Sequence, residues 1–479
     1  MIEIVPYNET YIQIKTDKGV AMELKEEFSF FVPGYRHMPK YKFTPWTGKI
    51  YLFNAHKRTI YKGLLSHVID YFETNDYQYT IDESLIETEE ISLFEAGKFC
   101  QSLDLPMDPY DYQVDAFCHA VRNNRALFLS PTSSGKSYII YLITRFYEGR
   151  KLIIVPTKGL IKQMHTDFQQ YSKGTYEGLD HEKKWKDGVI SDSIVTTWQS
   201  IYKLPQEFFD QFDVIIGDEA HHFQANSLTS ILENSPNCKY RFGFTGTLDG
   251  AKAHKMVLEG LFGKVYQTTT TKELMEDGKV AELSIKMINL KYPDKIRQAL
   301  AKAKYQDEIN YIISSKKRNN FIKNLTLSLK GNTLLLFQRV EDHGEKLYEI
   351  IKDEATNRKV FFVYGKTNVD AREEVRTVVE QEKDAIIIAS YGVFSTGISI
   401  KSINNVIFAS PSKSRIRNLQ SIGRGLRISE TKTKCTLYDI SDDFKWKTWI
   451  NHTLKHMQER FKIYSSEKFK IKLYNVKLK

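Results

Sequence analysis

The sequence has few of the features that mark a secreted, zinc-stabilised or membrane protein. Its 4 cysteines among 479 residues form no Cys-x-x-Cys pair, which argues against a zinc ribbon or a disulfide framework. No apolar run approaches the roughly 20 residues that span a bilayer, and the N-terminus lacks a basic region followed by an apolar stretch. Low-complexity segments are also lacking. We therefore expect a folded, soluble, cytoplasmic protein without a membrane partner.

The charge balance is basic, with a formal net charge of +10. Such a surface attracts polyanions, which include nucleic acids and acidic membranes. Basicity alone is weak evidence, because many basic chains carry their charge for solubility. A local pattern of basic residues is therefore needed before the charge indicates a nucleic-acid partner.

The chain predicts an α/β protein with two lobes. From residue 125 onward, short β-branched runs alternate with helix-length amphipathic stretches, a pattern typical of parallel strands joined by crossover helices. The runs form two sets, and a stretch rich in lysine and glutamate near residues 268–318 separates them. We predict one lobe over residues 101–285, a second over 286–450, and a basic helical tail over 451–479.

Residues 1–100 predict a separate small α+β domain. No Asp or Glu occurs from Phe28 to Ile69, whereas basic residues alternate there with aromatic ones. Segregated positive charge interleaved with rings suits phosphate contacts and base stacking, so we predict that Arg36, Lys42 and Trp46 bind nucleic acid. The alternative is that the rings form the core of a small sheet.

A phosphate-binding loop is predicted between an apolar strand ending at Leu129 and a helical stretch starting at Tyr138. Backbone N–H groups at the helix start would hold phosphate oxygens, Lys136 would neutralise their charge, and the Ser137 hydroxyl would bind Mg²⁺. Ser130 replaces the first glycine of the general pattern, so an ordinary turn is the alternative. The predicted nucleotide contacts are Pro131, Thr132, Ser133, Ser134, Gly135, Lys136 and Ser137.

Two adjacent carboxylates, Asp218 and Glu219, end the apolar strand that begins near Phe212. Asp218 can complete the Mg²⁺ shell, and Glu219 can orient and deprotonate the attacking water, the two tasks that phosphoanhydride hydrolysis asks of carboxylates. An acidic pair at a strand end can also be a solvated cap. The loop and the pair together favour hydrolysis of ATP.

Arg424 and Arg427 lie in the second predicted lobe, within Gln420-Ser-Ile-Gly-Arg-Gly-Leu-Arg. One interpretation of the two arginines is a basic helix start. They also suit an approach to the γ-phosphate, where arginines stabilise transition-state charge by roughly 10³ to 10⁵ in rate. Hydrolysis would then be coupled to lobe closure.

These motifs, in this order, resemble those of superfamily 2 helicases, together with Gly246-Thr247 and the Asp-Glu-Ala-His box at residues 218–221. The resemblance implies two RecA-like lobes. It also implies that Gln113 reads adenine, that Gly397 contacts the nucleotide, and that a further set links nucleotide state to nucleic-acid grip. That coupling set is His221, Thr245, Thr247 and Gln420.

Softer matches to the same superfamily predict contacts to backbone phosphates. They are Thr157, Lys158, Thr197, Trp198, Gln338 and Thr396. Taken singly, each such match is more often an ordinary loop at the end of a strand. Ser399 departs from the family pattern, which usually has an acidic or amide residue there, and this weakens the assignment of its loop to γ-phosphate sensing.

Over nearly its full length the sequence resembles the UvsW family of recombination helicases from tailed phages, through Pro39–Lys49, Lys272–Gly278 and Ser390–Ser399. The resemblance implies ATP- and Mg²⁺-dependent unwinding and branch migration of forks, Holliday junctions and R-loops in recombination, replication and repair. It further implies a monomer or weak oligomer in the host cytoplasm. Two alternatives stay open: an RNA helicase of the DEAH-box type, and an ATP-switched DNA-binding module that does not unwind.

Overall fold

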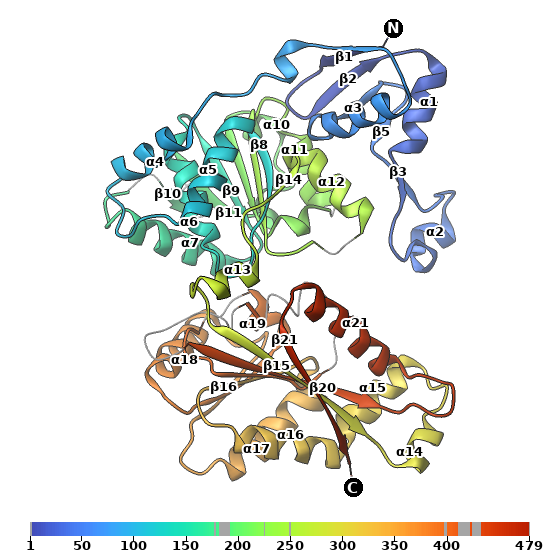
Figure 1. Ribbon diagram of the computed structural model, residues 1–479, viewed down its shortest axis with the longest axis vertical. Helices are drawn as coiled ribbons and strands as arrows, with labels where there is room; N and C mark the ends of the chain where they lie inside the picture. The colour runs from blue at the N-terminus through green and yellow to red at the C-terminus, as the bar shows by residue number, and fades with distance from the viewer. Residues whose placement is uncertain are drawn as a thin grey trace. The chain divides into compact units, whose positions relative to one another are not determined.

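The computed structural model describes residues 2–176, 179–181, 192–224, 226–248, 251–396, 400–410, 422–423 and 433–478. The chain forms two compact units, residues 1–130 with 135–269, and residues 131–134 with 270–479. Within the described residues each unit contains one seven-stranded sheet, and the first unit also carries a five-stranded sheet (Figure 1). In the same residues, no helix is long and apolar enough to cross a membrane.

The first unit begins with a small mixed sheet, as predicted. Its strands run in the order β5 (Phe53–Asn54), β6 (Thr59–Tyr61), β2 (Tyr11–Lys15), β1 (Ile2–Pro6), β7 (Tyr79–Ile81). Buried and exposed residues alternate along β1, so one face of the sheet packs inward. The helices are α1 (Lys18–Glu27), η2 (Lys62–Leu64), α3 (Leu65–Thr74) and η3 (Glu83–Leu85). Asp17 begins α1, because its Oδ1 accepts the N–H groups of Gly19 and Val20.

An arm, residues 29–51, extends from this small sheet (Figure 1). Its base is a two-stranded ribbon, β3 (Ser29–Phe31) with β4 (Lys49–Tyr51), and between them lie η1 (Tyr35–His37) and α2 (Pro39–Phe43). Gly48 has a positive φ of 86°, and a Cβ there would lie 2.1 Å from the Tyr35 ring. Only glycine therefore lets the chain turn so closely around this ring.

The large sheet of the first unit is entirely parallel in its described pairs, which confirms the parallel sheet predicted there. Its order is β10 (Leu179–His181), β11 (Ser193–Thr197), β9 (Lys151–Val155), β12 (Val214–Asp218), β13 (Tyr240–Thr245), β8 (Arg125–Leu129), β14 (Val265–Gln267). The accompanying helices are α4 (Leu93–Ser102), α5 (Asp111–Asn123), α6 (Lys136–Phe146), α7 (Lys158–Tyr171), α9 (Trp198–Ile201), α10 (Gln206–Phe209), η4 (Ala220–Gln224), α11 (Asn226–Glu233) and α12 (Lys252–Phe262). Strands buried on both faces read as continuous apolar runs, which is why the sequence revealed them.

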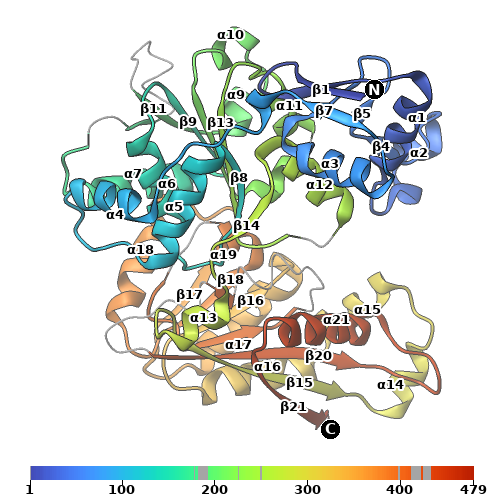
Figure 2. The ribbon, with the colours of Figure 1, turned by 45° about the horizontal axis from the view of Figure 1, so that its top comes forward.

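The small sheet and the first lobe share one hydrophobic core and a buried polar contact. Arg241 is fully buried and donates to Thr10 Oγ1 at 2.9 Å and to the Leu232 and Cys238 carbonyls at 3.1 Å. Gly63 lies against α12, where a Cβ would approach the Glu259 carbonyl to 2.1 Å. Both ribbon views show the two parts side by side (Figures 1 and 2). The small domain is therefore packed firmly against the first lobe.

The second unit contains the second parallel sheet. Its order is β17 (Val360–Val363), β18 (Ile386–Ser390), β16 (Thr333–Phe337), β19 (Asn405–Phe408), β20 (Lys434–Asp443), β15 (Glu282–Lys291), β21 (Lys470–Lys477). Its helices are α13 (Thr271–Glu276), α14 (Asp294–Ala299), α15 (Tyr305–Ser314), α16 (Lys316–Ser328), η5 (Val340–Gly344), α17 (Glu345–Glu354), α18 (Val369–Gln381), α19 (Tyr391–Thr396) and α21 (His452–Ser466). The prediction of two parallel sheets after a small α+β domain is thus confirmed.

Two details of the predicted layout are corrected. The segment 451–479 is no helical tail, because α21 is followed by β21, which pairs in parallel with β15 at the edge of the sheet. The predicted lobe boundary between residues 285 and 286 falls inside β15, whose full length pairs with β20. Figure 2 shows α21 lying along β20, so the C-terminal residues are part of the second lobe.

Candidate nucleotide and nucleic-acid sites

The predicted phosphate-binding loop links β8 to α6 at the carboxyl edge of the first large sheet. Ser130, which replaces the usual glycine, is fully buried. Its N–H donates to the Thr245 carbonyl at 2.8 Å, and its Oγ accepts from Thr268 Oγ1 at 3.0 Å. Thr245 at the end of β13 and Thr268 directly after β14 therefore satisfy the serine, so the substitution is compatible with the loop.

Gly135 brings the loop into α6 in a left-handed conformation, with φ 76°. A Cβ at this position would lie 2.3 Å from Nε2 of Gln113, the predicted adenine reader. Gln113 is only 4% exposed, and its Oε1 accepts the Tyr110 N–H at 2.9 Å. Glutamine and loop are therefore packed together. The loop itself is closed by Ser134 Oγ, which donates to the Pro131 carbonyl at 2.7 Å.

The start of α6 is suited to an anion. Its N-cap residue is Gly135, which has no side chain to accept the first N–H groups, and the helix dipole favours negative charge there. Lys136 Nζ donates to the Ser130 carbonyl at 3.3 Å. The Ser137 Oγ lies 2.8 Å from the hydroxyl of Tyr171 at the end of α7. Lysine and serine hydroxyl are thus both positioned at the loop.

The acidic pair belongs to a connected set of polar groups at the ends of β12 and β13. The Asp218 Oδ1 accepts the N–H of Glu219, which has a positive φ of 49°. Glu219 Oε2 lies 3.4 Å from Nδ1 of His221, and this nitrogen lies 3.0 Å from Thr245 Oγ1. Thr245 Oγ1 donates in turn to the Thr247 carbonyl at 2.9 Å.

The direction of these bonds fixes the histidine tautomer. The single hydroxyl proton of Thr245 goes to the Thr247 carbonyl, so the hydroxyl can only accept from His221. The imidazole must therefore carry a hydrogen on Nδ1, which also faces the Glu219 carboxylate. The structure thus brings together Asp218 and Glu219 with three predicted coupling residues, His221, Thr245 and Thr247.

The predicted magnesium ligands, Ser137 and Asp218, can be judged by the oxygens they offer. Within the described ranges no group of three His, Cys, Asp or Glu side chains could hold a metal ion. Mg²⁺ commonly binds one or two protein oxygens together with substrate phosphates and water, and Ser137 and Asp218 supply oxygens of this kind. The donor set therefore fits a nucleotide-bound magnesium.

The softer motif residues of the first lobe have structural tasks as well. Thr157 begins α7, and its Oγ1 accepts the Leu160 N–H at 3.4 Å. Thr197 is 4% exposed, and its Oγ1 lies 3.1 Å from Ser200 Oγ. Trp198 packs partly against the core, whereas Lys158 is exposed. Lys158 is the most exposed of these four residues.

In the second lobe, Gln338 is exposed directly after β16, and its N–H donates to Ser410 Oγ at 3.2 Å. Thr396 is the last residue of α19. Four further predicted residues lie outside the described residues: Gly397, Gln420, Arg424 and Arg427. Their roles stay predictions.

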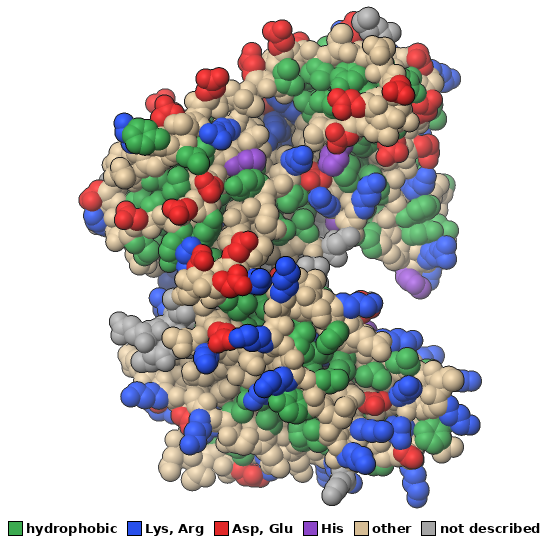
Figure 3. All heavy atoms as spheres, in the orientation of Figure 1, with side chains coloured by type: hydrophobic (Ala, Val, Ile, Leu, Met, Phe, Trp, Pro, Cys, Tyr) green, Lys and Arg blue, Asp and Glu red, His purple; other side chains and the backbone are tan. Residues whose placement is uncertain are grey.

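The arm presents rings and positive charge at the surface, and Figure 3 shows hydrophobic and basic side chains together there. Phe43 is 83% exposed and Phe31 53%, so these rings are not the core of a small sheet. Arg36 and Lys42 are also exposed. Trp46 is half-buried, and its Nε1 donates to the Lys49 carbonyl at 2.8 Å.

Comparison with known proteins fits this arrangement. Three family models match: "DNA helicase UvsW, N-terminal" over residues 2–82, "Type III restriction enzyme, res subunit" over 52–250, and "Helicase conserved C-terminal domain" over 316–429. The ATP-dependent DNA helicase uvsW of Enterobacteria phage T4 is 35% identical, and the match covers 98% of both chains. The chain belongs to the UvsW family. It is therefore an ATP-dependent helicase of superfamily 2.

Other comparisons agree with this family assignment. The crystal structure of T4 UvsW matches with a TM-score of 0.53 and 33% identity over the whole of both chains. The putative helicase 22 of a Sulfolobus islandicus filamentous virus is 25% identical, with 83% of this chain and 79% of that protein covered. Since the chain belongs to the UvsW family, the two units built on parallel sheets are RecA-like lobes, as the sequence predicted.

Sequence reasoning missed two groups of this site. Tyr171 lies 34 residues after Ser137, and no local pattern connects a helix-end tyrosine with a phosphate loop. Phe31 lies in a short apolar run that reads as an ordinary strand. Only the turn of the arm exposes its ring.

Proposed function

We propose that this UvsW-family helicase uses Mg²⁺ and ATP to unwind and branch-migrate DNA forks, Holliday junctions and R-loops in recombination, replication and repair. The observation that carries the proposal is the connected set Glu219, His221, Thr245 and Thr247 beside the phosphate loop. Such a set gives the hydrolytic carboxylate a physical connection to the strand-end loop that follows β13. The T4 relative, matched from end to end, is named a DNA helicase.

Each residue of the nucleotide site has its own task in the proposed hydrolysis of ATP. The N–H groups of α6 and Lys136 hold the phosphates, while Gln113 contacts adenine. Ser137 and Asp218 would hold Mg²⁺, which would supply neutralisation of the charge that develops on the phosphates. Glu219 orients the water and takes its proton, and the Nδ1–H of His221 faces this carboxylate. We assign Arg424 and Arg427 to the γ-phosphate, Gly397 to the nucleotide, and Gln420 to coupling.

The arm and the motif loops supply the grip on nucleic acid in this proposal. Exposed Arg36 and Lys42 suit phosphates, and the neighbouring rings suit unpaired bases at a junction. Lys158, Gln338 and Thr396 would contact the strand backbone. We further propose that the protein works in the host cytoplasm as a monomer or weak oligomer.

Unwinding assays on forks, four-way junctions and RNA duplexes test the proposal, with Lys136→Ala as the inactive control. We expect strand separation and phosphate release to be stimulated by DNA forks and to be lost in Lys136→Ala. Preference for RNA duplexes over forks would favour the RNA helicase alternative. Fork binding with ATP but without phosphate release would favour the ATP-switched binding module.

A further inference from the structure

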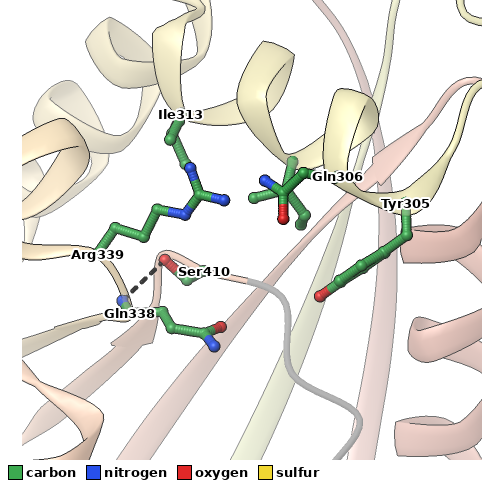
Figure 4. Close-up of a pocket in the computed structure, with 7 residues that line it drawn as sticks. Tyr305, Gln306, Ile313, Gln338, Arg339 and Ser410 are labelled. Carbon is green, nitrogen blue, oxygen red and sulfur yellow. Dashed lines mark hydrogen bonds between the residues drawn. The ribbon is translucent and has the colours of Figure 1, made fainter. Parts of the chain in front are cut away.

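A small pocket lies in the second lobe, beside residues whose function the nucleotide site does not explain (Figure 4). Its volume is about 90 Å³. Gln338 and Arg339 follow β16, and Ser410 follows β19, so the pocket sits at the carboxyl ends of neighbouring parallel strands. Ligands of open α/β sheets bind preferentially at this edge. Its position is therefore that of a binding site.

The other wall comes from α15, which contributes Tyr305, Gln306, Ile309 and Ile313. Tyr305 is 38% exposed, and its ring centre lies 5.4 Å from that of His456 and 5.9 Å from that of His452. The two imidazoles of α21 thus support the ring. Ile309 and Ile313 form an apolar surface beside the Gln306 amide.

The strand-end wall is held by buried polar groups. The Ser410 Oγ accepts the Gln338 N–H at 3.2 Å and lies 3.3 Å from Nδ1 of the fully buried His343. The Ser410 carbonyl accepts the Tyr391 hydroxyl at 3.1 Å. The preceding carbonyl, of Ala409, accepts from the buried Arg318 at 2.9 Å. The described strand-end residues that line the pocket are consequently held in place without a ligand.

The lining selects the chemistry of the occupant. Arg339 is the single charged residue among the seven that line the pocket, and its charge is partly engaged, by Asn310 at 3.0 Å and Asp342 at 3.6 Å. A bare phosphate would therefore find little free positive charge. A ring, an apolar wall and two side-chain amides instead suit a neutral heterocycle that carries hydrogen-bond donors and acceptors. The Gln306 amide nitrogen already donates to Asn310 Oδ1 at 2.8 Å, so this amide offers chiefly its oxygen.

The size of the pocket limits the occupant to one ring system. An apolar cavity of about 150 Å³ holds one benzene molecule, so about 90 Å³ admits the edge of a single base but no stacked pair. We propose that the pocket accepts one unstacked nucleobase of the strand on which the helicase moves. This inference rests on the proposed function. It adds a base contact to the second lobe, whose other proposed contacts with DNA are all to the strand backbone.

Abasic DNA tests the proposal, because it keeps every phosphate and sugar but lacks the bases. Fluorescence anisotropy would measure the affinity of the full-length protein for a thymidine strand and for the same strand with abasic residues. We expect the wild type to bind the abasic strand roughly 5- to 100-fold more weakly, since base contacts contribute on this scale. Tyr305→Ala and Gln306→Ala should each lower the ratio of the affinity for the thymidine strand to that for the abasic strand severalfold.

Gln298→Ala, an exposed glutamine on α14, is the matched control and should keep the wild-type ratio. Melting temperatures would verify that every variant is folded. An unchanged ratio in both pocket variants, or equal wild-type affinity for the two strands, would overturn the base pocket. The motor is tested separately by DNA-stimulated ATPase and its loss in Lys136→Ala, so failure of the motor proposal and failure of the pocket proposal give different results.

Discussion

At the scale of single residues, the hydroxyl of Tyr171 positions the Ser137 side chain. Its oxygen lies 2.8 Å from Ser137 Oγ, and its ring packs edge-on against Tyr138 at 4.6 Å. A serine that ligates Mg²⁺ with an oxygen lone pair must direct its hydrogen elsewhere, and the Tyr171 oxygen can accept it. The tyrosine therefore favours the metal-binding orientation of the serine.

Removing this hydroxyl should weaken the use of magnesium. We expect Tyr171→Phe to raise the Mg²⁺ concentration for half-maximal ATPase severalfold while leaving the rate at saturating Mg²⁺ nearly unchanged. Tyr141→Phe is the control, because its ring packs in the same aromatic group while its hydroxyl accepts from Arg145. Superimposable Mg²⁺ titrations of wild type and Tyr171→Phe would contradict the positioning role.

The residue scale also separates what sequence can and cannot predict. The loop residues and the pair Asp218–Glu219 were predictable, because each motif is local and follows an apolar strand. The tautomer of His221 was not, because it depends on where Thr245 directs its proton. The packing of Gln113 on Gly135 likewise arises from the fold, which joins residues of separate elements.

At the scale of elements, the arm carries an exposed ring that can be tested without disturbing the core. Phe43 is 83% exposed, so its truncation removes little packing. We expect Phe43→Ala to lower affinity for forked DNA by about fivefold or more, the effect of losing one base stack, with unchanged basal ATPase. Binding titrations would measure it. Phe94→Ala, a ring 68% exposed on α4, should leave fork affinity unaltered, and an equal loss in both variants would refute a specific role of the arm.

The C-terminal strand β21 shows why the prediction of a helical tail was wrong. The sequence 468–479 is dense in lysine and reads as a solvated tail, whereas β21 pairs with β15, almost 190 residues earlier. Parallel pairing over such a separation leaves no local signal. Two buried carboxylates anchor α21, the helix before this strand. Asp439 accepts from Arg460 and Tyr464, and Glu308 accepts from His452.

Glu308 acts as the cap of α21 from another helix. Its fully buried carboxylate accepts the N–H groups of His452 at 2.9 Å and Thr453 at 2.7 Å. We expect Glu308→Gln to destabilise the second unit by about 1 to 3 kcal/mol, because the amide offers one acceptor oxygen in place of two. Thermal unfolding would measure the change. Glu459→Gln, at an exposed pair on α21, should have almost no effect, and similar shifts in both variants would contradict the capping role.

At the scale of the whole molecule, each unit contains a histidine that is kept neutral. Burial lowers the pKa of His119 in the first unit to about 4, with Arg122 adding to the effect. Burial lowers the pKa of His343 in the second unit to about 3, with Arg318 and Lys346 acting in the same direction. In the unfolded chain both imidazoles take up a proton near pH 6.5.

The unfolded state therefore binds more protons than the folded state between about pH 6.5 and pH 4. The stability that the neutral histidines contribute is complete above pH 6.5 and is lost as the pH falls. We expect melting temperatures to decrease from pH 7 to pH 5, with His343 contributing at most about 1.4 kcal/mol per pH unit. His343→Asn should be less stable at pH 7 yet less sensitive to acid. His56→Asn, at an exposed histidine, is the control and should keep the acid sensitivity of the wild type. If His343→Asn also kept that sensitivity, protonation of the buried imidazole would not be the cause of acid destabilisation in the second unit.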